Sequence, residues 1–530
     1  MAVALPATER RHRVVGGVAL GVVVAVAAGL AIALHRAGHT QGDDFALYLR
    51  QARSIFDGDP AQVVADNRFT VIQSGGEFSP IAYPWGWPLL LAPFVRVWGL
   101  DYDRLKLVEV ACFCVWLVLV HGIVRRRLGR IVALAVTAAV GTTPILLVHT
   151  DSLLSELPHA AAVAVLIWWL DRIRKRSTLI GASTRDLVIL GVSLTVAFNM
   201  RRETILLLVA IGLVQAVELL VERRRTSGPW SPSSWPWRAL VLPHAGFAVS
   251  ALGFQLLLPS MVLPENADSG PKHIDDRLMD YPTELAKQLG IDDGHWWGLL
   301  LLALALAGIV VGLRKRPGLD GPLAAVTVVS AIAVSTHFRL IGRYYFQILP
   351  WILMFATAAI LAAVFAVVGL VARSSHEPER RATPQRAWLS LSAVLATLPL
   401  AFLVALHVAV LPGRIATAMD FDRAGRQQVG PTHPDYLPIY DAIVAYTAPD
   451  DVVVFYRART MTLLTDRRTL QLGTSEASLA RAELRADFYA QQRGSTYSQP
   501  ELTELEGYRR GYTVAWSDDQ WILWDLHPDD

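Results

Sequence analysis

The chain contains few cysteines and few charged residues. Only two cysteines occur in 530 residues, Cys112 and Cys114, and both lie in one apolar run. Two residues apart on a helix, they face different sides, so no disulfide framework is available for an outer domain. Charged residues make up 18% of the chain, whereas soluble proteins are nearer about 25%. The low share of charge therefore excludes an ordinary soluble protein.

The sequence contains many long apolar runs. Hydrophobic residues make up 53% of the chain, and they cluster in runs of roughly 18–25 residues, the length that crosses a bilayer. The first run, from Val14 to about Leu34, is too long for the apolar core of a signal peptide, so we expect an uncleaved first span. Further spans are predicted near 105–124, 131–149, 153–170, 187–200, 203–221, 239–262, 296–313, 321–337, 344–371 and 388–411, which makes about eleven crossings.

Basic clusters at every second junction predict the orientation of these spans. They lie at 10–13, 125–127, 172–176, 223–225, 314–316 and 373–386. Because Lys and Arg accumulate on cytoplasmic loops, we predict a cytoplasmic N-terminus and an extracytoplasmic C-terminus. The high content of Ala, Val and Arg favours a bacterial plasma membrane. The basic residues thus follow topology, so we expect contacts with membrane lipids and no nucleic acid partner.

The orientation leaves three longer segments outside: a first loop at 35–86, a second at 264–293 and a tail at 412–530. In the tail, 451–456 is typical of a strand, and 512–516 with 520–524 is typical of a hairpin. The segments 436–446 and 477–492 look helical. The predicted fold is an α-helical polytopic membrane domain over 1–411, followed by a small extracytoplasmic α/β domain over 412–530.

Two adjacent carboxylates, Asp43 and Asp44, stand just past the first span. Charges this close to hydrocarbon are costly, so the pair indicates chemistry, ion handling or a proton path. Asp43 can also be the N-cap of a helix that starts near Phe45. Glu156, at the start of a later span, can equally be a first-turn acid favoured by the helix dipole.

Four arginines lie on the predicted outer side, where topology needs few positive charges. They are Arg201, Arg202, Arg339 and Arg343. One interpretation is that they snorkel to lipid headgroups. The other is that they bind a phosphate, since the guanidinium fork donates two parallel hydrogen bonds. A carboxylate base beside a phosphate clamp suits transfer from a phosphate leaving group, because the base takes the acceptor proton and the arginines stabilise the departing charge.

The chain resembles the polyprenyl-phosphate-dependent glycosyltransferases of the GT-C fold, with about eleven helices. The likeness covers about 14–371, in the right order and with each element on the outer side. It is strongest to the branch that holds protein mannosyltransferases and lipid A-modifying transferases. The matching elements are Asp44 four residues before Tyr48, the segment 79–94 with its Tyr-Pro-Trp-Gly-Trp-Pro-Leu-Leu, Ser155-Glu156-Leu157-Pro158, and 343–350 with its Arg-Tyr and Pro.

The resemblance implies an inverting transfer of a sugar from a polyprenyl-phosphate donor to a hydroxyl acceptor on a glycan, lipid or protein. By position it makes Asp44 the general base. Asp43 is the second candidate, because the family has Asp-Glu where this chain has Asp44-Phe45. The donor phosphate would be bound by Arg343 together with Arg201 or Arg202. Supporting roles fall to Glu156, Tyr48, Tyr83 and Arg339.

Aromatic residues gather where the first loop returns to the membrane. Tyr83, Trp85 and Trp87 are typical of an interfacial aromatic belt, with a sugar platform as the alternative. No metal site is predicted. A divalent cation stays open as a cofactor, since Asp275 and Asp276 share one loop and carboxylates are ligands for such ions.

A transporter or flippase of lipid-linked glycans is the alternative function. Transporters place charges and broken helices near the midplane, often in paired repeats. Here the charges collect at one face and the sequence shows no repeat. A scaffold whose outer tail binds a partner would leave the acids and outer arginines unexplained. The pattern therefore favours the glycosyltransferase.

Overall fold

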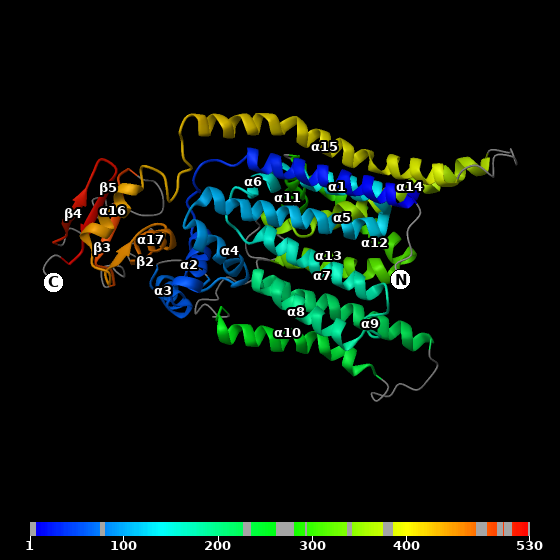
Figure 1. Ribbon diagram of the computed structural model, residues 1–530, viewed down its shortest axis with the longest axis horizontal. Coiled ribbons are helices and arrows are strands. Elements are labelled where there is room, and N and C mark those ends of the chain that lie inside the picture. The colour runs from blue at the N-terminus through cyan, green and yellow to red at the C-terminus, as the bar shows by residue number, and fades with distance from the viewer. Residues whose placement is uncertain are drawn as a thin grey trace.

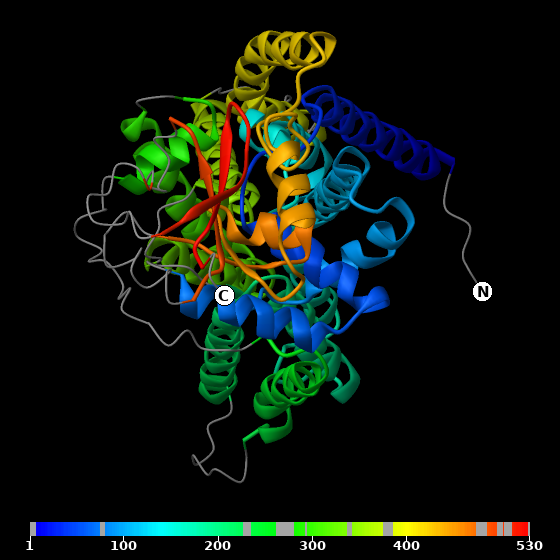
Figure 2. The same ribbon diagram turned by 90° about the vertical axis from the view of Figure 1, so that its left-hand side faces the viewer.

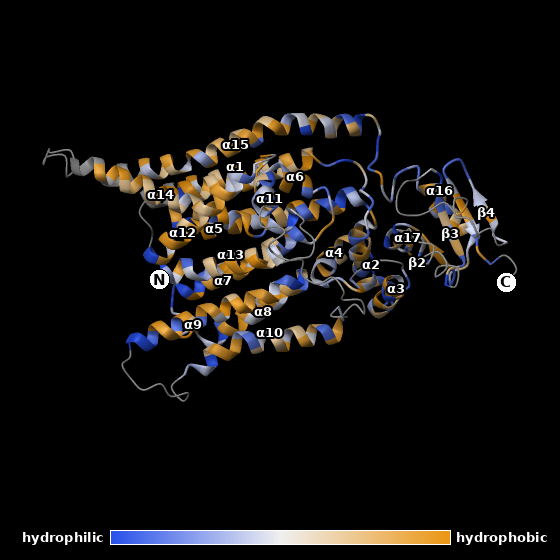
Figure 3. Ribbon diagram, turned by 180° about the vertical axis from the view of Figure 1, so that it is seen from behind, coloured by the Kyte–Doolittle hydropathy of each residue, from blue (hydrophilic) through white to orange (hydrophobic). Residues whose placement is uncertain are grey.

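In the computed structural model of the protein, long helices form a bundle with a small sheet domain at one end (Figure 1). Shorter helices lie between the two parts. The hydropathy colouring shows the bundle as predominantly apolar along its length (Figure 3). The structure describes residues 7–74, 80–225, 235–260, 280–291, 294–336, 342–374, 385–472, 485–494, 502 and 511–527.

The long helices follow the apolar runs of the sequence. Eight stretches in the described ranges are long and apolar enough to cross a membrane, so this is a multi-pass membrane protein. Each predicted span overlaps a helix; the number of about eleven crossings stays a prediction. The long helices are α1 (Ala7–Ala33), α5 (Tyr102–Gly141), α7 (Glu156–Arg174), α8 (Thr184–Met200), α9 (Leu207–Arg225), α10 (Trp237–Leu257), α12 (His295–Lys315), α13 (Pro317–Thr336), α14 (Leu349–Ser374) and α15 (Gln385–Arg423).

Two predicted spans share α5, which is broken inside. Gly129 has a φ of 85°, a conformation that glycine adopts at little cost. A Cβ at Gly141 would lie 3.4 Å from the side chain of Leu117, so the chain folds back at this break. The two halves of α5 correspond to the spans predicted at 105–124 and 131–149. Short helices complete the bundle: α6 (Pro144–His149), α11 (Asp280–Gln288), and the 3₁₀ turns η1 (Arg202–Leu206) and η4 (Gly342–Tyr345).

Buried charge joins three helices at the end of the bundle opposite the sheet. Arg127 of α5 pairs in bidentate fashion with Asp171 of α7, at 2.7 Å for each nitrogen. Its Nε lies 3.2 Å from Asp320 of α13. The basic last turn of α9 also ends on this side (Figure 1). The clusters at 125–127 and 223–225, both predicted to be cytoplasmic, thus lie away from the C-terminal domain.

The first outer loop folds into helices that carry the sheet domain. These are α2 (Asp44–Asp57), α3 (Pro60–Gln73) and α4 (Gly86–Trp98). Apolar faces of α2 and α4 pack together through Phe45, Leu49 and Leu91. A Cβ at Gly86 would lie 2.5 Å from the carbonyl oxygen of Asn199. Glycine therefore allows α4 to begin directly against the end of α8.

The tryptophans of this segment are core residues. Trp85 and Trp87 are fully buried, and the indole of Trp85 donates to the carbonyl of Pro259 at 3.0 Å. The prediction of an interfacial aromatic belt is wrong for both. The reason is that α4 turns inward against α8 and shields its start from lipid and water.

The C-terminal domain contains a five-stranded mixed sheet of order β2-β1-β3-β5-β4 (Figure 2). β1 is parallel to β2 and β3, and β5 is antiparallel to β3 and β4. Tyr440, Phe455 and Trp521 lie in its core. The elements are α16 (Leu437–Tyr446), β1 (Val452–Val454), α17 (Ala458–Thr465), β2 (Arg468–Leu470), β3 (Phe488–Gln492), β4 (Thr513–Ser517) and β5 (Trp521–Asp525).

Predictions for this domain had mixed outcomes. The strand in 451–456, the hairpin and the helix at 436–446 are confirmed. The helix predicted over 477–492 is wrong at its end, because Phe488–Gln492 forms β3. Tyr489 and Ala490 are buried between two neighbouring strands, and such pairing outweighs local helix propensity. Residues 477–484 lie outside the described ranges.

Candidate active site

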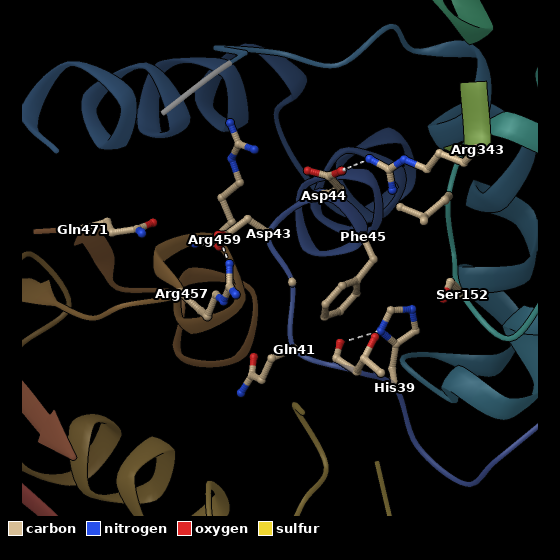
Figure 4. Close-up of a pocket in the computed structure, with 13 residues that line it drawn as sticks. His39, Gln41, Asp43, Asp44, Phe45, Ser152, Arg343, Arg457, Arg459 and Gln471 are labelled. Atoms are coloured by element: carbon tan, nitrogen blue, oxygen red, sulfur yellow. Dashed lines mark hydrogen bonds and ion pairs between the residues drawn. The ribbon is translucent and has the colours of Figure 1, made fainter. Parts of the chain in front are cut away.

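A cavity of about 450 Å³ opens where the first loop, η4 and the C-terminal domain meet. Figure 4 shows the acid pair in its centre, with Arg343 on one side and Arg457 on the other. The C-terminal domain contributes three lining residues that the sequence analysis did not single out. The lining consists of His39, Thr40, Gln41, Gly42, Asp43, Asp44, Phe45, Ser152, Leu154, Arg343, Arg457, Arg459 and Gln471.

Asp44 presents its carboxylate to this cavity from the first turn of α2. Its side chain is 37% exposed. One oxygen, Oδ1, accepts a hydrogen bond from the hydroxyl of Tyr83 at 2.6 Å. The other, Oδ2, lies 3.3 Å from Nη2 of Arg343. The carboxylate is thus oriented from two sides while one face stays open to a substrate.

Tyr83 and Tyr48 pack against each other beside Asp44. Their ring centroids lie 4.4 Å apart. Burial, together with the nearby Asp44 carboxylate, holds the pKa of Tyr83 well above its usual value. Its hydroxyl therefore stays protonated and donates to Asp44. The hydroxyl of Tyr48 pairs with Oγ of Ser155 at 3.0 Å.

Glu156 links the two arginine sites that the sequence placed far apart. Its side chain is only 4% exposed. Oε1 accepts from Nη1 of Arg201 at 2.7 Å and lies 3.0 Å from Nε of Arg343. Nε2 of His149 is 3.5 Å from the second oxygen. Glu156 is a first-turn acid of α7, as the simpler interpretation held, and it also positions both guanidinium groups.

Arg201 and Arg202 point to different places. Arg201 is paired with Glu156 and Glu203, and its guanidinium carbon lies 4.9 Å from the ring centroid of Tyr344. The guanidinium of Arg202 instead donates to backbone carbonyls, those of Ala82 at 2.7 Å and of Ser260. The structure therefore brings Arg201 to Arg343 through Glu156, whereas Arg202 fastens the first loop.

Asp43 faces the C-terminal domain. It occupies the N-cap position of α2 but makes no side-chain capping bond. One oxygen accepts from the backbone N–H of Arg459 at 3.1 Å, and the other lies 3.6 Å from Nη1 of Arg457. Burial raises the pKa of the Asp43 carboxyl above its usual value. The two adjacent acids thus have separate partners.

Arg459 binds the C-terminal domain to the first loop. It is 3% exposed; its Nε donates to Oδ1 of Asn67 at 2.9 Å, and Nη2 donates to the carbonyl of Pro80 at 2.6 Å. Its guanidinium carbon lies 5.4 Å from the ring centroid of Tyr83. No local pattern marks Arg459, because Asp43 is 416 residues away in the chain.

Three of the residues named from the sequence lie outside the described ranges. They are Arg339, Asp275 and Asp276. Within those ranges, no three His, Cys, Asp or Glu side chains form a group that could hold a metal ion. The cavity contains a partly exposed carboxylate, that of Asp44, beside guanidinium groups, a combination that suits proton abstraction next to an anion.

Comparison with known proteins assigns this architecture to a class. The family model of dolichyl-phosphate-mannose-protein mannosyltransferases matches residues 82–250, which include α4 and the Glu156 turn. No curated protein matches the chain. The fold is the GT-C fold of polyprenyl-phosphate-dependent glycosyltransferases, which confirms the resemblance and the predicted fold class.

Solved structures with this fold share little sequence with the chain. ArnT from Cupriavidus metallidurans, bound to undecaprenyl phosphate, is similar with a TM-score of 0.55 and 14% identity, over 96% of this chain and 98% of that one. The oligosaccharyltransferase AglB from Archaeoglobus fulgidus, in complex with an inhibitory peptide and a dolichol-phosphate, has a TM-score of 0.50 and 10% identity. That match covers 89% of this chain and 69% of the other.

Proposed function

We propose that this protein is an inverting glycosyltransferase of the extracytoplasmic face of a bacterial plasma membrane. It moves a sugar from a polyprenyl-phosphate donor to a hydroxyl acceptor. The observation that carries the proposal is the pair of Asp44 and Arg343 on the cavity wall, where Oδ2 of Asp44 lies 3.3 Å from Nη2 of Arg343. The proposed base, Asp44, and the proposed phosphate-binding group, Arg343, thus lie close enough to contact the same substrate.

The chemistry divides between the two side chains. Asp44 takes the proton of the acceptor hydroxyl, and the acceptor oxygen bonds to the anomeric carbon. The bond from that carbon to the phosphate oxygen breaks, and polyprenyl phosphate leaves with the bonding electrons. Arg343, backed by Glu156 and Arg201, stabilises the departing charge.

The contacts of Arg343 suggest how the donor prepares the base. The guanidinium of Arg343 lies against two carboxylates, those of Asp44 and Glu156. A phosphate offers a guanidinium fork the same bidentate geometry as a carboxylate, so the donor phosphate competes with Oδ2 of Asp44 for Arg343. That oxygen is then free to accept a proton, while Tyr83 keeps Oδ1 in place.

Two further observations support the orientation and the donor class. The basic last turn of α9 lies at the bundle end opposite the C-terminal domain (Figure 1). Because that domain lines the cavity, this is the arrangement expected if the cavity faces outward. Two proteins with this fold have polyprenyl carriers in their structures, undecaprenyl phosphate in one and dolichol-phosphate in the other. We infer that a carrier of this kind supplies the sugar here.

The proposal is tested with the full-length protein in lipid nanodiscs. Undecaprenyl phosphate, the leaving group, should bind the wild type, and Arg343→Gln should weaken binding by about tenfold or more, since hydrogen bonds to charged groups contribute about 1.5–3 kcal/mol. Arg96→Gln is the matched control, because Arg96 is 62% exposed on α4 and outside the cavity lining.

Turnover is then measured with labelled polyprenyl-phosphate sugars and membrane acceptors. Asp44→Asn should bind undecaprenyl phosphate and transfer no sugar. Normal transfer by a variant that lacks both Asp44 and Asp43 would exclude the proposed base. Movement of lipid-linked sugar across the bilayer without a covalent product would instead support the flippase alternative.

A further inference from the structure

The half of the cavity formed with the C-terminal domain contains polar groups without partners. Among the described residues, Nε of Arg457 and the amide oxygens Oε1 of Gln41 and Gln471 are buried and make no hydrogen bond. All three side chains line the same cavity as Asp44. Buried polar groups are nearly always paired, so three unpaired ones in a cavity mark a place for a polar ligand.

Arg457 indicates the charge of the ligand, because it is the charged side chain among the three. Its side chain is 33% exposed, and its ion pair with Asp43 spans 3.6 Å, too long for a hydrogen bond. Its guanidinium carbon also lies 5.9 Å from the ring centroid of Tyr456. Within the described ranges these two contacts hold the guanidinium fork, and its Nε donates no hydrogen bond. Such a fork binds carboxylate or phosphate groups in bidentate fashion.

The position of Arg457 decides which substrate it meets. In an inverting displacement the acceptor oxygen approaches the anomeric carbon from the side opposite the leaving group. Arg343, the proposed phosphate ligand, belongs to η4 at the membrane bundle, whereas Arg457 belongs to the C-terminal domain. Figure 4 shows the two arginines on opposite sides of the acid pair. The Arg457 side is therefore where the acceptor enters.

We propose that Arg457, Gln41 and Gln471 form an acceptor subsite that recognises an anionic glycan, one that carries a carboxylate or phosphate group beside its hydroxyls. The inference rests on the proposed function. Arg457 binds the anionic group, and the two amide oxygens accept hydrogen bonds from sugar hydroxyls. Asp43 serves as a positioning residue that keeps Arg457 directed into the cavity. The charge of the lining agrees, since three arginines face two aspartates.

The test measures binding of two matched probes to the full-length protein in nanodiscs. A galacturonic acid trimer carries carboxylates, and a galactose trimer is its neutral counterpart. The wild type should bind the anionic trimer about tenfold more tightly, as a charged hydrogen-bonded pair predicts. Arg457→Gln should remove this preference, whereas Arg468→Gln, a half-exposed arginine of the same domain outside the lining, should keep it.

A second measurement separates this inference from the proposed function. Binding of undecaprenyl phosphate should be unchanged in Arg457→Gln and weakened in Arg343→Gln. Equal binding of the two trimers by the wild type, or an Arg457→Gln variant as weak for undecaprenyl phosphate as Arg343→Gln, would overturn the acceptor subsite. Failure of the wild type to bind undecaprenyl phosphate would count against the proposed function alone.

The variant Arg457→Lys guards against a folding defect. It keeps the positive charge that pairs with Asp43 but lacks the planar fork. Its thermal unfolding should match that of the wild type, and its preference for the anionic trimer should fall without vanishing. A full wild-type preference in Arg457→Lys and Arg457→Gln alike would overturn the inference.

Discussion

Asp43 and Asp44 are neighbours in sequence with opposite surroundings. Asp44 is 37% exposed and faces the cavity, whereas Asp43 is 9% exposed and accepts a backbone hydrogen bond from α17. The difference arises because consecutive residues at a helix start point about 100° apart around the axis. At the residue scale, we therefore propose Asp44 as the base and a positioning role for Asp43.

Replacing each acid by its amide should separate these roles. Asp44→Asn should lower the rate of sugar transfer by about 10²–10⁴-fold, the usual contribution of a general base. Asp43→Asn keeps an oxygen for the N–H of Arg459, so its rate should fall by less than about tenfold. Initial rates at saturating donor decide the matter. If Asp43→Asn loses as much as Asp44→Asn, the assignment of the base to Asp44 is wrong.

Glu156 is predicted to matter for stability as well as for activity. It is the shared partner of two guanidinium groups, those of Arg201 and Arg343. Breaking a buried ion pair by removing one partner costs about 3–5 kcal/mol, so Glu156→Ala should unfold at a clearly lower temperature than the wild type. Glu203→Ala removes a more exposed partner of Arg201 and should cost less. Equal unfolding temperatures for Glu156→Ala and the wild type would contradict this role.

At the scale of elements, the site depends on how α4 meets α8. Gly86 begins α4 where a Cβ would lie 2.5 Å from the carbonyl oxygen of Asn199. The segment just before Gly86 carries Tyr83, which orients Asp44. A shift of α4 would therefore move a hydrogen-bond donor of the site as well as loosen the packing of two helices.

Gly86→Ala should lower both stability and turnover. The added methyl group forces α4 away from α8, and overpacking of this kind costs about 1–3 kcal/mol. Gly122→Ala is the control, because a Cβ at that helical position meets nothing within 4 Å and alanine favours a helix. Thermal unfolding in detergent and initial transfer rates measure the two effects. A Gly86→Ala protein as stable as Gly122→Ala would show that α4 can shift without cost.

At the scale of the whole molecule, the C-terminal domain supplies part of the cavity lining. Arg459 joins α17 to the first loop through Asn67 and Pro80. Thr70 of α3 adds a hydrogen bond from its hydroxyl to the carbonyl of Thr469 at 2.7 Å. The domain thereby closes one wall of the cavity above the membrane bundle.

Arg459→Gln should weaken the docking of the C-terminal domain on the first loop. The substitution leaves buried acceptors of the first loop unpaired, at about 1–3 kcal/mol for each lost partner, so hydrogen exchange should rise in α3 and α17 together. Arg467→Gln is the matched control, since Arg467 bonds to Thr447 within the domain. Unchanged exchange in α3 for Arg459→Gln would show that docking does not depend on this arginine.

Features that depend on a short stretch of chain could be predicted from the sequence. Run length and period place the helices, because a bilayer needs a fixed length of apolar chain. Short motifs identified Asp44, Tyr83, Glu156 and Arg343, and the structure brings these four to one place. Local patterns failed for the helix at 477–492 and for Trp85, because strand pairing and helix packing are set by distant residues.

Which of these side chains meet depends on contacts between distant parts of the chain. It directed Arg202 to backbone carbonyls and Asp43 to the C-terminal domain. It also added Arg457 and Arg459, on a helix that reaches the acid pair from more than 400 residues away. Charges so far apart in sequence leave no periodic signal, since their pairing depends on docking between domains. The membrane fold and the cavity residues of the bundle side could therefore be predicted from local sequence, whereas Arg457 and Arg459 join the cavity only through docking of the C-terminal domain.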